Sequence, residues 1–113
     1  MLKQTEKQLQ KAILDYLQLL ENKGELWFER LNAGTAFLPA GRGMYKIKLC
    51  RLGTADVIIV KNGLILFAEL KSKSGKQSID QKSFEIKVRK VGAGYCIVRS
   101  IEELEKQLNL LNK

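Results

Sequence analysis

The sequence contains no histidine, and this absence excludes several kinds of catalytic site. A Ser-His or Cys-His triad, a zinc site with imidazole ligands and a nuclease that uses a histidine base all need this side chain. The two cysteines, Cys50 and Cys96, lie far apart in the sequence and lack the spacing of metal ligands. Catalysis by this chain would therefore have to rest on carboxylates, lysine or a hard metal ion.

Long apolar segments are also missing. No apolar run approaches the roughly 20 residues that cross a bilayer, and the N-terminal residues MLKQTEKQLQ are too polar for a signal peptide. We therefore expect a cytoplasmic protein that does not associate with membranes. The chain has 113 residues, of which 45% are hydrophobic, so we expect one compact domain over residues 1–113.

Positive charge is in clear excess. Twenty Lys and Arg residues stand against twelve Asp and Glu residues, which gives a formal net charge of +8. Such a surface favours a polyanionic partner, and nucleic acid is the first candidate. A basic composition can also serve solubility alone, so the charge leaves both interpretations open.

Hydrophobic periodicity and turn signals predict a mixed α/β domain. An amphipathic helix over 5–22 is followed by strands over 26–31 and 45–49, which are separated by loops around Gly34, Pro39, Gly41 and Gly43. The remaining expected elements are strands over 55–60 and 64–70, a helix over 78–90, a strand over 95–98 and a helix over 100–109.

The strongest local signal is a β-hairpin around Asn62 and Gly63, the dipeptide that best fits a two-residue type I′ turn. Counting outward from this turn brings Asp56 directly opposite Glu69. Directly opposed like charges destabilise a strand pair by a few tenths to about 1 kcal/mol. A divalent cation between the two carboxylates would remove this repulsion, and Mg²⁺ favours one or two carboxylates plus waters and phosphate oxygens.

Lys71 lies two residues beyond Glu69, so strand alternation places it on the same face as both carboxylates. A lysine there could hold the attacking water and stabilise charge on a phosphate, while a metal ion lowers the pKa of the water. These are the parts needed to hydrolyse a phosphodiester. Glu-Leu-Lys is also a common tripeptide that can simply solvate the end of a strand, but the matching position of Asp56 favours the metal site.

Taken together, these segments resemble the PD-(D/E)XK nuclease superfamily and, within it, the VRR-NUC (virus-type replication-repair nuclease) family. The resemblance covers nearly the whole chain and rests on TEKQLQKAILDYL, ERLNAGTAF, Gly53-Thr-Ala-Asp56, Glu69-Leu-Lys71, SGKQSIDQKSFEIKV and GAGYCIVRSIEEL. It implies a restriction-endonuclease-like α/β core with a mixed sheet flanked by helices in the order αβββαβα. The sequence departs from the commonest family pattern at Ala55, where proline is usual, and it has no proline after Glu-x-Lys.

By this resemblance, Asp56, Glu69 and the backbone carbonyl of Leu70 would bind the metal, and Glu6 of the first helix would complete the site. Lys71 would be catalytic together with Asp56 and Glu69. Glu6 has a second interpretation, because an acid in the first turn of a helix is stabilised by the helix dipole in any case.

The resemblance also implies a functional glutamine, Gln81, on the helix that follows the Glu-x-Lys strand. Ser78-x-x-Gln81 is itself a capping-box pattern, so Gln81 could serve the helix start, the site or both. The candidates for DNA contact are Arg30, Asn32, Lys73 and Lys76, of which the two lysines are favoured because their loop follows the Glu-x-Lys strand, and further Arg42, Lys46, Lys48 and Lys87. A solvated basic surface is the alternative for each of them.

The expected function is a Mg²⁺- or Mn²⁺-dependent DNA endonuclease that acts on branched DNA such as Holliday junctions. The resemblance further implies a homodimer of bacterial or phage origin. A restriction-type or general DNA nuclease on the same fold is the alternative enzyme. A non-catalytic nucleic-acid-binding module is the alternative of another class.

Overall fold

The computed structural model describes residues 5–112. Its elements are α1 (Glu6–Asn22), β1 (Trp27–Arg30), β2 (Thr35–Ala40), β3 (Gly43–Lys48), β4 (Val57–Lys61), β5 (Leu64–Leu70), α2 (Ile79–Lys90), β6 (Gly94–Val98) and α3 (Ile101–Asn109). None of the helices formed by residues 5–112 is long and apolar enough to span a bilayer.

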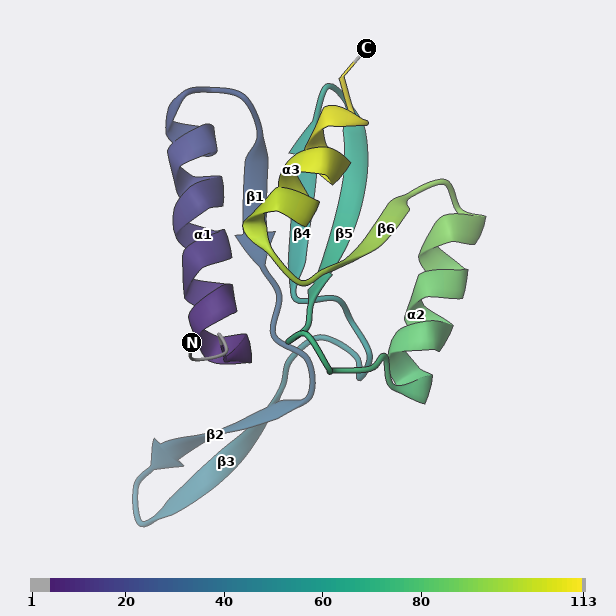
Figure 1. The fold of residues 1–113 in the computed structure, drawn as a ribbon. Helices are drawn as coiled ribbons and strands as arrows, with labels where there is room; N and C mark the ends of the chain where they lie inside the picture. The colour runs from purple at the N-terminus through teal and green to yellow at the C-terminus, as the bar shows by residue number, and fades with distance from the viewer. Residues whose placement is uncertain (1–4, 113) are drawn as a thin grey trace.

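Four strands form the main sheet in the order β1-β4-β5-β6 (Figure 1). Strand β4 pairs antiparallel with β1 and with β5, whereas β5 pairs parallel with β6. The parallel pair requires a crossover connection, and α2 supplies it. Together with the helices, the strands of this sheet follow the chain order αβββαβα, which confirms the predicted core.

Strands β2 and β3 form a separate two-stranded sheet between β1 and β4 in the chain, and it extends away from the main sheet (Figure 1). The sequence interpretation treated residues 35–40 as loop because of Pro39 and the flanking glycines, and this was wrong. Both strands of an isolated hairpin are edge strands, where a proline costs no ladder hydrogen bond to a second neighbour. We call residues 31–55 the arm.

One hydrophobic core lies between the main sheet and the helices α1 and α3. Its buried side chains include Leu9, Ile13, Leu17, Val57, Ile59, Leu66, Ala68, Leu104 and Leu108. The three leucine and isoleucine positions of α1 recur every four residues, so they lie on one stripe of the helix. Every second residue of β4 and β5 points into this core. The residues between them point to the opposite face of the sheet.

Helix α2 packs on that second face of the sheet, and it is held more loosely. Phe84 contacts the ring of Phe67 edge-on, with the ring centroids 5.1 Å apart, and lies 6.1 Å from the ring of Tyr95. No residue of α2 is fully buried. The helix therefore covers only the part of the face over β5 and β6.

Candidate functional site

The hairpin of β4 and β5 places Asp56 beside Glu69. Asn62 and Gly63 have φ angles of 53° and 75°, as a type I′ turn requires. The ladder keeps the predicted register to its last pair, one residue before Asp56 and Glu69. Beyond the ladder, the Asp56 carboxylate accepts a hydrogen bond from the backbone N–H of Leu70 at 2.7 Å. The predicted register is confirmed, and this bond fixes the direction of the Asp56 side chain.

Glu69 is 2% exposed, although it carries a carboxyl group. Burial raises the pKa of Glu69 to about 8, and a hydrogen bond with Asp56 and the negative charge of Asp56 add to this shift. The positive charge of Lys71 and a hydrogen bond from Tyr95 oppose it. The carboxyl groups of Asp56 and Glu69 are thus adjacent, at the start of β4 and the end of β5.

Lys71 follows β5 directly and is partly exposed. Its backbone N–H donates to the carbonyl of Val98 at 3.0 Å, which continues the pairing of β5 with β6 by one residue. Alternation along the strand assigns Lys71 to the face of Glu69, opposite the hydrophobic core. The site therefore combines two adjacent carboxyl groups with one ammonium group.

A series of hydrogen-bonded polar side chains begins at Glu69. The sequence interpretation did not include these residues. The hydroxyl of Tyr95 donates to Glu69 Oε2 at 3.3 Å and accepts from Gln77 Nε2 at 3.0 Å. Gln77 also donates to Glu85 Oε1 at 3.0 Å, and Glu85 forms an ion pair with Arg89 at 2.8 Å. These residues come from β6, α2 and the loop before it, so only the parallel pairing of β5 with β6 brings them together.

Arg99 holds the loop that begins at Lys71. Its guanidinium donates from Nη1 to the carbonyls of Ser72 at 2.6 Å and Gly75 at 2.7 Å. The sequence interpretation did not single out Arg99, because a single arginine after a strand carries no local signal. This contact anchors the segment between the site and α2.

Glu6 lies in the first turn of α1 and is exposed. The N-terminal end of α1 is at the same end of the sheet as the start of β4 and the end of β5 (Figure 1). Within residues 5–112, however, no three His, Cys, Asp or Glu residues are grouped so that they could hold one ion. The structure thus brings Asp56 and Glu69 together without Glu6, and the ligand roles of Glu6 and of the Leu70 carbonyl stay predictions.

Gln81 forms the capping box that its spacing from Ser78 predicted. Its Oε1 accepts from the backbone N–H of Ser78 at 2.8 Å, and the hydroxyl of Ser78 accepts from the backbone N–H of Gln81 at 3.1 Å. In this arrangement the side-chain oxygen of Gln81 serves the start of α2. A role of Gln81 in the site is a prediction that this contact does not test.

The four residues predicted to contact DNA occupy different surroundings. Lys73 and Lys76 are exposed in the loop after Lys71, and Asn32 is exposed at the base of the arm. Arg30 pairs with Val57, whose side chain is in the core, so Arg30 is on the face of the sheet opposite the carboxylate pair. Of the four, the two lysines lie nearest to the site along the chain.

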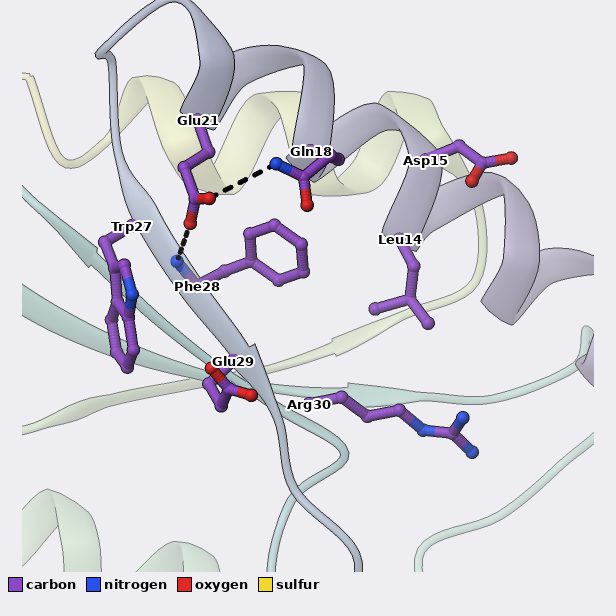
Figure 2. Close-up of a pocket in the computed structure, with 8 residues that line it drawn as sticks. All are labelled: Leu14, Asp15, Gln18, Glu21, Trp27, Phe28, Glu29 and Arg30. Atoms are coloured by element: carbon purple, nitrogen blue, oxygen red, sulfur yellow. Dashed lines mark hydrogen bonds between the residues drawn. The ribbon is translucent and has the colours of Figure 1, made fainter.

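Arg30 instead lines a cleft of about 400 Å³ between α1 and β1. Figure 2 shows its guanidinium at one end of this cleft and Glu21 near the other. Glu21 accepts a hydrogen bond from the backbone N–H of Phe28 at 3.2 Å and one from Gln18 at 3.2 Å, which ties α1 to the edge strand. The cleft has no pair of adjacent buried carboxyl groups, and it does not include the site at Asp56.

Comparisons with known proteins bear on the fold. No family model and no curated protein matches the sequence. A solved structure described as a VRR_NUC domain superposes with a TM-score of 0.61 over 93% of this chain and 96% of that chain, at 21% sequence identity. This chain has the VRR_NUC fold. At that level of identity the match shows the fold, and in this chain the pair of β4 and β5 lies at the centre of the main sheet.

Proposed function

We propose that this protein is a metal-dependent DNA endonuclease of the VRR-NUC type. The observation that carries the proposal is the pair of adjacent carboxyl groups of Asp56 and Glu69, one of them 2% exposed, next to Lys71. An acidic pair at the end of two apolar strands costs free energy unless the pair takes up a proton or shares a cation. The VRR_NUC fold and the net charge of +8 agree with a phosphodiester in nucleic acid as the substrate.

The residues present fit a hard divalent cation such as Mg²⁺ or Mn²⁺. Asp56 and Glu69 offer only oxygen donors, and Mg²⁺ is commonly held by one or two carboxylates while waters and substrate phosphate oxygens fill the other positions. The carbonyl of Leu70 would be the third protein ligand in this proposal. The metal would activate a water and neutralise charge on the phosphate.

Other groups of the protein would position the two carboxylates and stabilise charge on the substrate. The backbone N–H of Leu70 holds one oxygen of Asp56 in place, and the hydroxyl of Tyr95 does the same for Glu69. Lys71 places a positive charge beside the pair, where it can orient the attacking water and stabilise charge that develops on the phosphate. Arg99 keeps the loop after Lys71 from moving away from the site.

The finer part of the proposal concerns the substrate and the assembly. We propose branched DNA such as a Holliday junction as the substrate, which follows from the resemblance to structure-selective nucleases. A homodimer would present two sites to such a junction. An open apolar surface supports the dimer: Trp27 is 48% and Ile65 44% exposed on the sheet face that α2 leaves uncovered, and Val91 at the end of α2 is 83% exposed.

The test uses the purified protein with linear duplex, single-stranded, flapped and four-way-junction DNA, each with Mg²⁺ or Mn²⁺ and with EDTA. We expect metal-dependent cutting that prefers the junction. Asp56→Ala and Lys71→Ala should reduce the cutting rate at least about 100-fold, since each removes a group that acts in the transition state. Asp15→Ala, which removes an exposed carboxylate of α1, is the matched control and should cut as the wild type does.

The outcomes separate the alternatives. Equal cutting by the wild type and both site variants would refute the assignment of Asp56 and Lys71. Metal-dependent cutting of all four substrates at one rate would favour a general nuclease. Binding of DNA without any cutting would favour a non-catalytic binding module.

A further inference from the structure

The arm, residues 31–55, leaves the main sheet next to the site. Its base is closed by a bridge between Ala33 and Cys50 and by the backbone N–H of Leu31, which donates to the carbonyl of Asp56 at 2.7 Å. Figure 1 shows β2 and β3 extending away from the end of the main sheet at which β4 begins. Six residues per strand give the hairpin a length of roughly 20 Å at about 3.3 Å per residue.

The charge of this part of the chain is of one sign. Between Glu29 and Asp56 the sequence has no acidic residue and five basic ones, which are Arg30, Arg42, Lys46, Lys48 and Arg51. Four of the five, all but Arg30, lie in the arm, so the arm contributes +4 of the net charge of +8. A polyanion would meet no repulsive carboxylate along the whole hairpin.

The two faces of the hairpin differ in charge. Residues that pair across the strands share a face, and Lys46 pairs with Phe37 while Lys48 pairs with Thr35. All four of these side chains are exposed, and Pro39 with the exposed Met44 continues the same face toward the turn. The opposite face is apolar and consists of Ala36, Leu38, Tyr45 and Ile47. The two lysines are thus concentrated on one side of the hairpin, about 7 Å apart along β3.

We propose that the lysine face of the arm, Thr35, Phe37, Lys46 and Lys48, binds the phosphate backbone of duplex DNA beside the site. The inference rests on the proposed function, because the arm would bind the DNA that the site cuts. A two-stranded ribbon has the width to enter the major groove, and lysines two residues apart on one strand can each reach a phosphate. The contact is independent of base sequence, and Phe37 adds apolar surface between the charges.

The test measures binding of a fluorescent duplex by anisotropy in EDTA, so that no cutting occurs, over a series of salt concentrations. The double variant Lys46→Ala/Lys48→Ala should raise Kd about tenfold. It should also lower the slope of log affinity against log salt by about 2, since each lost phosphate contact removes about 0.9. The control is Lys90→Ala/Lys106→Ala, which removes the same charge from exposed positions on α2 and α3. It should change Kd less than about twofold and leave the slope unchanged.

Equal losses in both double variants would reduce the effect to net charge and overturn the proposal, as would an unchanged slope for the arm variant. Leu38→Ser/Tyr45→Ser, on the apolar face, should keep wild-type binding and wild-type mass by light scattering. Loss of both in that variant would assign the arm to a contact between copies of the chain and would also overturn the proposal.

The proposed function fails or stands separately. If the wild type cuts none of the DNA substrates but Lys46→Ala/Lys48→Ala still loses affinity and slope, the nuclease assignment fails and the arm proposal stands. If the arm variant binds like the wild type while Asp56→Ala abolishes cutting, the arm proposal fails and the nuclease assignment stands.

Discussion

The carboxyl group of Glu69 links the stability of the protein to pH. Its pKa is about 8 in the folded protein against an ordinary value of 4.5, so folding takes up a proton between these two values. The stabilisation is complete below about pH 4.5 and is lost as the pH rises toward 8. We therefore expect the free energy of unfolding in EDTA to fall over this window, measured by urea titration at several pH values.

Glu69→Gln should remove this dependence, because the amide has the same shape and no charge. At about pH 8 in EDTA the variant should be more stable than the wild type by on the order of 1–3 kcal/mol, the usual cost of a poorly compensated buried polar group. Mg²⁺ should raise the Tm of the wild type only. Glu105→Gln, at an exposed position of α3, is the control, and a pH dependence that Glu69→Gln shares with the wild type would contradict the account.

In the proposed site, the hydroxyl of Tyr95 would position Glu69. Tyr95→Phe keeps the ring that packs on Phe84 but removes the hydroxyl between Glu69 and Gln77. Loss of such a partner of a metal ligand typically weakens metal affinity about 10- to 100-fold. We expect the Mg²⁺ concentration for half-maximal cutting to rise by such a factor while the rate at saturating Mg²⁺ changes less. Tyr45→Phe is the control, and an unchanged Mg²⁺ midpoint in Tyr95→Phe would show that the hydroxyl does not position Glu69.

At the scale of the elements, the loop before β4 closely approaches the start of α2. Gly53 has a φ of +87°, and a Cβ on it would lie 2.2 Å from the carbonyl oxygen of Asp80. Gly53→Ala should therefore push the loop that leads to Asp56 away from α2. We expect a loss of at least about 1–3 kcal/mol in the free energy of unfolding, the range of a strained backbone, together with reduced cutting.

Gly63→Ala is the control that tests backbone strain without a steric clash. Gly63 also has a positive φ, of 75°, but nothing lies within 4 Å of its Cβ position. The alanine should cost stability there through the backbone alone and leave the cutting rate of the folded protein unchanged. Equal effects of the two substitutions on cutting would show that the contact between Gly53 and Asp80 does not hold the site.

The β4–β5 hairpin could be predicted from the sequence, whereas the contacts across β5 and β6 could not. A turn at Asn62 and Gly63 and strand alternation were enough to place Asp56 beside Glu69, because a hairpin is a local structure with a period of two. Tyr95, Gln77 and Arg99 could not be found this way. Their contacts depend on the parallel pairing of β5 with β6, which joins residues more than 20 positions apart and has no turn to set its register.

Strand β2 was missed for the opposite reason, because its local signals point the wrong way. Pro39 and the glycines around it favour a loop, and only the ladder with β3 overrides them. The placement of Glu6 has a similar basis. The helix expected over 5–22 already placed Glu6 in the first turn of α1, but the distance from that turn to β4 and β5 depends on how the helix packs on the sheet.

At the scale of the whole molecule, one face of the main sheet is only half covered. Trp27, Val60 and Ile65 form a row across β1, β4 and β5 on this face, and α2 reaches only as far as β5 and β6. The exposed Val91 at the end of α2 borders the same surface. A second copy that covers these side chains would bury apolar area on both sides of a two-fold axis.

The proposed homodimer is tested by Ile65→Lys, which places a charge in the middle of this row. We expect the wild type to have the mass of a dimer by light scattering at micromolar concentration and the variant to have the mass of a monomer. Because Ile65 is 44% exposed, the lysine can point into solvent in the monomer, so the far-UV circular dichroism should stay unchanged. Ile86→Lys, at a residue of α2 that is 68% exposed, is the control for added charge. A monomeric wild type, or a variant that remains dimeric, would show that this face is not the interface, and junction cutting would then have to come from single copies.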